Sequence, residues 1–120
     1  SVSIDESLPK MLGDRRMLGQ VWSNLIANAL KYSERSSSPA IEIGYNVIEN
    51  ITVYHIKDNG IGFDPKYKEV IFNLFSRHSG DNYQGTGIGL AIVKKIIEKH
   101  NGKIWAESEP GKGSAFYFHV

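Results

Sequence analysis

The stretch Arg15-Arg-Met-Leu-Gly-Gln-Val-Trp-Ser-Asn-Leu-Ile-Ala-Asn-Ala-Leu-Lys-Tyr32 gives the clearest helical signal in the sequence. Gly13 and Asp14 precede it and supply a turn and a helix N-cap. Its apolar residues recur every three or four positions, as they do along one face of a helix: Leu18, Val21, Trp22, Leu25, Ile26 and Ala29. We therefore predict one long amphipathic helix whose apolar face packs on a core.

Alternating apolar and polar residues predict strands on both sides of this helix. They form a short edge strand and two hairpins: residues 2–4, a strand from 41, a strand from 51 that runs into Asp58, and residues 103–107 and 115–120. A second helix is expected over Ile88–His100, ended by Asn101-Gly102, and a short third helix within Pro65–Phe75. The order favours a single α+β domain over residues 1–120, a two-layer sandwich. About five strands would form a mixed, mostly antiparallel sheet, covered on one face by about three helices.

Composition excludes several classes of protein. Among 120 residues, 14 are Lys or Arg and 13 are Asp or Glu, so no basic excess indicates nucleic-acid binding. The absence of cysteine excludes disulfides and thiolate metal sites, and the four histidines show no paired zinc-ligand spacing. No apolar run approaches the roughly 20 residues that span a bilayer. Because the chain starts without methionine, we expect it to be a fragment of a longer protein.

Three polar segments could carry chemistry. Asn24, Asn28 and Lys31 are spaced to share one flank of the long helix, where amide oxygens suit Mg²⁺ and a lysine suits phosphate. Asp58-Asn-Gly-Ile-Gly62 places a carboxylate at a strand end beside two glycines that permit close approach of a flat ring. Gly85-Thr-Gly-Ile-Gly89-Leu90 opens the second helix, where exposed amides bind phosphate. Taken singly, each is more often a solvated helix face, a plain turn or an ordinary glycine loop.

Taken together and in this order, these segments resemble the catalytic domain of sensor histidine kinases. That family lies in an ATP-binding superfamily that also holds type II topoisomerases and ninety-kilodalton chaperones. The resemblance covers nearly the whole chain, and the segment from Ile104 to Gly111 looks like kinases of the phytochrome-like type. Asn101 stands where many members have glycine. The matching segments are the N box Asn24–Tyr32, the first glycine box Asp58–Gly62, the F box Ile71–Arg77, the second glycine box Gly85–Leu90 and the closing turn and strand Gly111–Phe116.

The resemblance implies a role for each matching residue. Asn28 would ligate Mg²⁺, Asn24 and Lys31 would face the phosphates, Arg77 would touch the γ-phosphate, and Asp58 would hold the adenine amine. Residues 63–86 would form a flexible lid over ATP. The other nucleotide-binding positions would be Tyr32, Gly60, Gly62, Gly85, Thr86, Gly87, Gly89, Leu90 and Ser114, the last by supporting Asp58 through a water.

The implied function is transfer of the γ-phosphoryl group of Mg-ATP to a histidine on a separate helical domain of the same protein, in two-component signal transduction. The full protein would be a cytoplasmic or membrane-anchored homodimer that acts on a response regulator, and the isolated chain would not label itself. Two alternatives remain. An ATP hydrolase or serine kinase of the superfamily would carry a glutamate where Asn24 stands. A non-catalytic nucleotide-binding module would be expected to lose Asn28, Asp58 or a glycine box.

Overall fold

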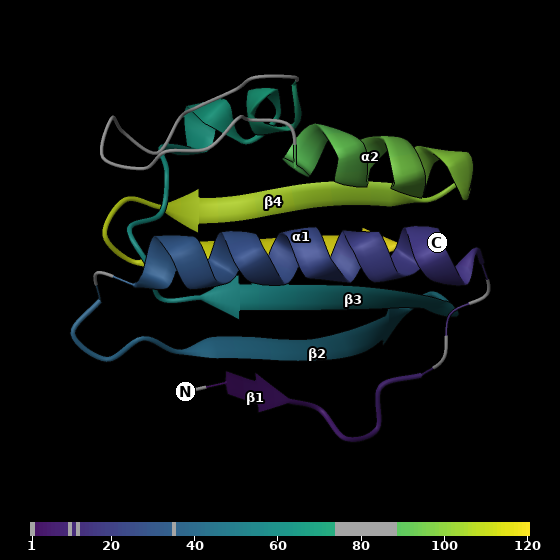
Figure 1. Ribbon diagram of the computed structural model, residues 1–120, viewed down its shortest axis with the longest axis horizontal. Helices are drawn as coiled ribbons and strands as arrows, with labels where there is room; N and C mark the ends of the chain where they lie inside the picture. The colour runs from purple at the N-terminus through teal and green to yellow at the C-terminus, as the bar shows by residue number, and fades with distance from the viewer. Residues whose placement is uncertain (1, 10, 12, 35, 74–88) are drawn as a thin grey trace.

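In the computed structural model the chain folds into a five-stranded sheet with both α-helices on one face (Figure 1). The strand order is β1-β2-β3-β5-β4; β1 pairs with β2 in parallel, and the other neighbours are antiparallel. The structure describes residues 2–9, 11, 13–34, 36–73 and 89–120. The elements are β1 (Val2–Ile4), α1 (Arg15–Ser33), β2 (Ile41–Ile48), β3 (Ile51–Asp58), the 3-10 helices η1 (Pro65–Tyr67) and η2 (Val70–Phe72), α2 (Gly89–Lys99), β4 (Lys103–Glu109) and β5 (Gly113–His119). The predicted α+β sandwich with a mixed, mostly antiparallel sheet is confirmed.

The third helix expected within residues 65–75 is wrong, because the described part of this segment forms only the short turns η1 and η2. Pro65 suits the first position of η1, and Asp64 caps it by accepting a hydrogen bond from the Lys66 N–H at 3.0 Å. After η2 the backbone of Asn73 is extended, which ends the turn. The apolar residues here are adjacent, so one turn already buries both Ile71 and Phe72.

The helix α1 begins and packs as its sequence predicts. Asp14 accepts a hydrogen bond from the Met17 N–H at 2.9 Å and so caps the first turn. Trp22 meets Phe118 edge-on, with ring centroids 5.1 Å apart. Burial of each large apolar side chain stabilises the fold by about 1.5–3 kcal/mol. The least exposed apolar residues of the core come from both layers: Val21, Leu25, Ile56, Val93, Ile97 and Phe118.

Two turns confirm the predicted chain reversals. Glu49 and Asn50 both have positive φ, at 51° and 68°, as a two-residue hairpin between β2 and β3 requires. Asn101 has φ 59° directly after α2, and the Gly102 N–H donates to the Ile97 carbonyl at 2.9 Å, so asparagine ends this helix as glycine usually does.

The face of the sheet opposite the helices carries polar and aromatic side chains. Trp105 on β4 stacks on Tyr117 of β5, with centroids 5.8 Å apart and planes 15° apart, and 37% of Trp105 is exposed. Trp105 is therefore a surface residue of this open face, whereas Trp22 packs on the core. Within the described residues, neither α-helix has the length and hydropathy of a membrane span.

Candidate functional site

Asp58 ends β3 and lies buried at the margin of the sheet, with 8% of its surface exposed. Its Oδ1 accepts a hydrogen bond from the Gly60 N–H at 2.8 Å. Burial raises the pKa of Asp58 above the ordinary 3.8, and the backbone hydrogen bonds from Gly60 and Ser114 act in the opposite direction. A buried carboxylate with few donors around it is a strong acceptor for a ligand N–H group.

The two glycines of this segment allow the chain to pass close to its neighbours. A Cβ atom at Gly60 would collide with the carbonyl oxygen of Tyr32, at the end of α1. Gly62 has φ +67°, and a Cβ atom there would collide with the carbonyl of Glu109. The Ile61 N–H donates to the same Tyr32 carbonyl at 3.2 Å. The segment after β3 is thus fixed between α1 and the turn that joins β4 to β5.

Asn59 fixes the other side of the same segment. Its Nδ2 donates to the Ser38 carbonyl at 2.7 Å, and its Oδ1 accepts from the Ala40 N–H at 2.9 Å. The polar loop before β2 is therefore held against the end of β3 by Asn59. The side chain of Asp58 is oriented instead by the hydrogen bond from the Gly60 N–H.

Asn24 and Asn28 form a pair of amides along α1. Their Nδ2 atoms are buried, and neither has a hydrogen-bond partner among the described residues. A buried polar atom without a partner costs about 1–3 kcal/mol, so a ligand that satisfies both would bind favourably. Asn24 also faces the start of α2, because a Cβ atom at Gly89 would lie 3.9 Å from its Cγ.

Lys31 and Tyr32 complete the α1 side of the site. Lys31 Nζ lies 5.9 Å from the centroid of the Tyr32 ring, and both side chains are partly buried. At the last turn of α1 the Lys31 ammonium group could therefore contact an anion, and the Tyr32 ring could pack against a flat ring.

Ser108 on β4 is a residue of the site that the sequence prediction missed. It accepts from the Phe63 N–H at 2.8 Å and donates to the Gly113 carbonyl at 2.8 Å, and its hydroxyl lies 3.0 Å from that of Ser114. Ser114 stands opposite Asp58 in the sheet register. The sequence did contain one indication that Ser108 points inward: it follows Ile104 and Ala106 at every second position, on the side of β4 that faces the helices.

The structure brings most predicted residues to one end of the sandwich. There the C-terminal ends of α1 and β3 meet (Figure 1), and the first turn of α2, with Gly89 and Leu90, adjoins Asn24. Arg77, Gly85, Thr86 and Gly87 lie outside the described residues, as does much of the predicted lid over residues 63–86.

These residues fit a magnesium nucleotide chemically. Asp58 offers an acceptor for an exocyclic amine, the orphaned amides offer donors for phosphate oxygens, and the other end of each amide offers an oxygen for a hard cation. Within the described residues no three His, Cys, Asp or Glu side chains cluster as a metal site. A Mg²⁺ ion here would therefore depend on the amide of Asn28 together with phosphate and water oxygens.

Comparison with known proteins gives consistent results. Residues 13–120 match the family of histidine kinase-, DNA gyrase B- and HSP90-like ATPases. The chain is 50% identical over 115 residues to the phytochrome-like protein Cph1 of Synechocystis sp., covering 95% of this chain and 15% of that protein. It is 42% identical over 117 residues to the methanogenesis regulatory histidine kinase FilI of Methanothrix harundinacea, covering 98% of this chain and 13% of that protein. The chain thus spans only a small part of these relatives.

Solved structures share the same fold. The mycobacterial sensor histidine kinase MprB superposes with a TM-score of 0.84 at 27% identity, covering 99% of this chain and 80% of that one. Full-length ShkA, solved in complex with AMPPNP, superposes with a TM-score of 0.81 at 26% identity, covering 100% of this chain and 24% of that one.

Proposed function

The chain belongs to the family of histidine kinase-, DNA gyrase B- and HSP90-like ATPases, among the catalytic domains of sensor histidine kinases, and from this premise we propose that it binds Mg-ATP and phosphorylates a histidine. The acceptor histidine belongs to a helical domain of the longer protein, which then passes the phosphoryl group to a response regulator. We also propose that the full protein is a homodimer, either cytoplasmic or anchored to a membrane.

The observation that carries the proposal is the pair of buried amides on α1 that lack partners among the described residues, together with the buried carboxylate at the end of β3. Asn24 and Asn28 leave two buried donors without partners among the described residues, and Asp58 leaves an acceptor at the same end of the fold. A nucleotide satisfies these needs together, because it offers phosphate oxygens at one end and an amine at the other. The AMPPNP bound by the structurally similar ShkA supports this assignment.

Each residue has a separate task in this proposal. Asn28 holds Mg²⁺ through its amide oxygen, Asn24 and Lys31 contact phosphate oxygens, and Arg77 spreads the charge that develops on the γ-phosphoryl group. Asp58 selects adenine, since adenine presents an amine where guanine presents a carbonyl. The remaining contacts are assigned to the base side (Tyr32, Gly60, Gly62, Ser114) and to the phosphate side (Gly85, Thr86, Gly87, Gly89, Leu90).

One position in the sequence, Asn24, favours histidine over water as the acceptor of the γ-phosphoryl group. Hydrolases and serine kinases of the superfamily carry a glutamate base four residues before the magnesium asparagine, and this chain has Asn24 there. An amide cannot take a proton from water or from a hydroxyl group. A neutral imidazole nitrogen needs no such base, because it attacks the γ-phosphorus through its lone pair while ADP departs.

The test is labelling with γ-³²P-ATP, with and without the helical domain of the longer protein. The chain alone should bind nucleotide, but neither label itself nor hydrolyse ATP appreciably, since water attack lacks the roughly 10²–10⁴-fold contribution of a general base. Adding the helical domain should give a label on that domain that is labile to acid and stable to alkali.

The control is the Asn24→Glu variant, which introduces a carboxylate where the hydrolases have one. Brisk ATP hydrolysis by the unmodified chain, or an acid-stable label on it, would assign the protein to the hydrolases or serine kinases instead. Nucleotide binding without any label on the helical domain would make the chain a non-catalytic nucleotide-binding module, and failure to bind nucleotide would contradict the proposed site.

A further inference from the structure

The strand β4 forms an edge of the sheet with unused backbone groups. β5 is its only hydrogen-bonded neighbour in the described part of the chain. Among the described residues, no backbone hydrogen bond crosses its outer edge between Lys103 and Glu107. Half of the N–H and C=O groups of an edge strand point away from its neighbour, and they form a template for another strand.

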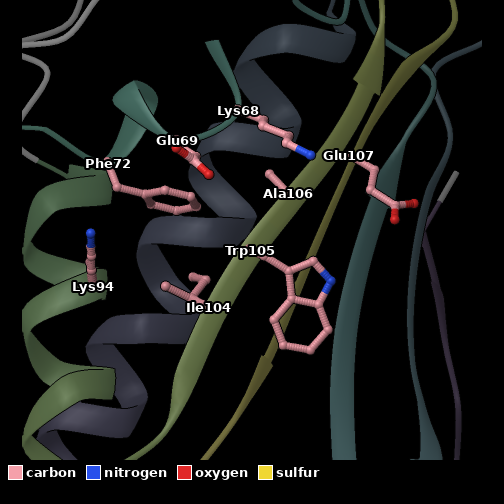
Figure 2. A pocket seen from close by; sticks show the side chains of 8 residues that line it. All are labelled: Lys68, Glu69, Phe72, Lys94, Ile104, Trp105, Ala106 and Glu107. Carbon is pink, nitrogen blue, oxygen red and sulfur yellow. The ribbon is translucent and has the colours of Figure 1, made fainter. Parts of the chain in front are cut away.

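A groove of about 430 Å³ runs beside this edge (Figure 2). Residues 104–107 of β4 line one side, and Phe72, Lys68 and Glu69 after η1 line the other, with Lys94 of α2 at the end. In Figure 2 the Phe72 ring projects from η2 towards β4, above Ile104. The groove therefore combines the outer edge of β4 with a wall in which the Phe72 ring stands among the charged side chains of Lys68, Glu69 and Lys94.

The dimensions of the groove suit one extended peptide. The five residues 103–107 of β4 extend for about 16 Å at roughly 3.3 Å per residue, which sets the length of a paired segment. In Figure 1, α2 lies beyond β4 at the margin of the sheet. An added strand would therefore lie in the plane of the sheet beside β4, with α2 packed against β4 on the helix side.

Charged residues on β4 define which peptide fits. Lys103 and Glu107 are exposed on the open face, on either side of Trp105, and neither forms an ion pair within the described residues. Ile104 and Ala106 point to the helix side, next to Phe72. Because residues opposite one another in a sheet share a face, an added antiparallel strand would place an acidic residue opposite Lys103 and a basic residue opposite Glu107.

We propose that the groove beside β4 binds an extended peptide segment of a partner protein as a sixth, antiparallel strand. The segment has a basic residue first, an acidic residue last, and apolar residues at the two positions opposite Ile104 and Ala106. The same charges that repel most strands from this edge select one with the complementary pattern. The groove contains none of the residues assigned to contact the nucleotide, although Lys68, Glu69 and Phe72 belong to the segment 63–86 that we expect to form the lid over ATP.

The probe is the end-blocked peptide Lys-Val-Thr-Val-Glu, which carries this pattern. Titration calorimetry with the chain should show binding, and hydrogen exchange should show new amide protection within residues 103–107. Both should persist in the Asn28→Ala variant, whose nucleotide site is damaged, so failure of the proposed kinase function leaves this result unchanged.

Matched variants test the charge pattern. Glu107→Lys should weaken binding of the probe about three- to tenfold, as expected for turning a favourable cross-strand pair into a repulsive one. The double variant Lys103→Glu/Glu107→Lys should prefer the reversed peptide Glu-Val-Thr-Val-Lys. Glu6→Lys, which makes the same charge change beyond the opposite edge of the sheet, should bind the probe as the unmodified chain does.

Three results would overturn the proposal. One is the absence of binding at millimolar peptide, and another is protection at β1 instead of β4. The third is protection of β4 without peptide in a chain that sediments as a dimer, which would identify a second copy as the occupant.

Discussion

At the scale of the single residue, Asp58 is both buried in the fold and needed as a charged hydrogen-bond acceptor. Burial raises its pKa above 3.8, so the folded chain holds this proton more tightly than the unfolded chain does. As the pH rises from the pKa of Asp58 in the unfolded chain to its pKa in the folded chain, the free energy of unfolding falls. Above both pKa values it stays lower by a constant amount. The carboxylate is thus kept at a cost to the nucleotide-free fold, in return for an acceptor at the site.

Asp58→Asn should therefore raise the free energy of unfolding of the nucleotide-free chain at neutral pH and leave it unchanged at pH values below 3.8. The amide oxygen of asparagine still accepts from the Gly60 N–H, so the hydrogen bond is kept. Urea unfolding at several pH values measures the effect. The pKa of Asp5 is lowered by the hydroxyl and N–H of Ser7, so Asp5→Asn should do the opposite and lower stability at neutral pH. Equal pH profiles for Asp58→Asn and the unmodified chain would contradict the prediction.

Asn28→Ala should abolish the dependence of ATP binding on Mg²⁺ while keeping the fold. The variant also removes a buried donor that lacks a partner among the described residues, so the nucleotide-free chain should lose less than the usual 1–3 kcal/mol of a broken buried hydrogen bond. Calorimetry with Mg²⁺ and with EDTA gives the metal dependence, and circular dichroism checks the fold. A variant that still responds to Mg²⁺ would show that another residue holds the ion.

At the scale of the element, the turn after β3 depends on glycine for two separable reasons. Gly62→Ala should destabilise the chain by well over 1–2 kcal/mol, roughly the cost of a left-handed alanine alone, because its Cβ also meets the Glu109 carbonyl. Gly111→Ala is the matched control, since φ there is +79° but nothing lies within 4 Å of the added carbon. Thermal unfolding of both variants separates backbone strain from collision. Similar losses in the two would show that the turn relaxes.

The elements also show what a sequence can and cannot predict. α1 was predictable because its apolar residues repeat with helical spacing, and the β2–β3 hairpin because Glu49-Asn50 interrupts two alternating runs. The helix expected near Pro65 was wrong, since three adjacent apolar residues carry no period. Ser108 was missed because its bond to the Phe63 N–H joins residues 45 positions apart, and no local pattern encodes such a contact. The site residues were identified by resemblance, and their roles remain predictions.

At the scale of the whole molecule, a nucleotide should stabilise both layers together, because its proposed ligands come from α1, β3 and the start of α2. At 100 times its dissociation constant a ligand adds about 2.7 kcal/mol to the free energy of unfolding. Mg-ATP should therefore raise the melting temperature by roughly 10 °C, because a change of 1 kcal/mol shifts the melting temperature of a domain of this size by about 4 °C. GTP at the same concentration should raise it much less, since guanine has no amine where Asp58 accepts. Equal shifts with ATP and GTP, measured by calorimetry, would remove Asp58 from base recognition.

The position of β1 has a mechanical consequence. β1 is held by a parallel register of only Val2, Ser3 and Ile4 on β2, with the Asp5 N–H donating to the Ile43 carbonyl at 2.9 Å. Its apolar side chains are largely exposed, at 58% for Val2 and 57% for Ile4. A pulling force on the N-terminus would shear these few bonds first, and β2 would still separate β1 from the strand that carries Asp58. Under such a force β1 would detach at one margin of the sheet while the strands around Asp58 kept their pairing.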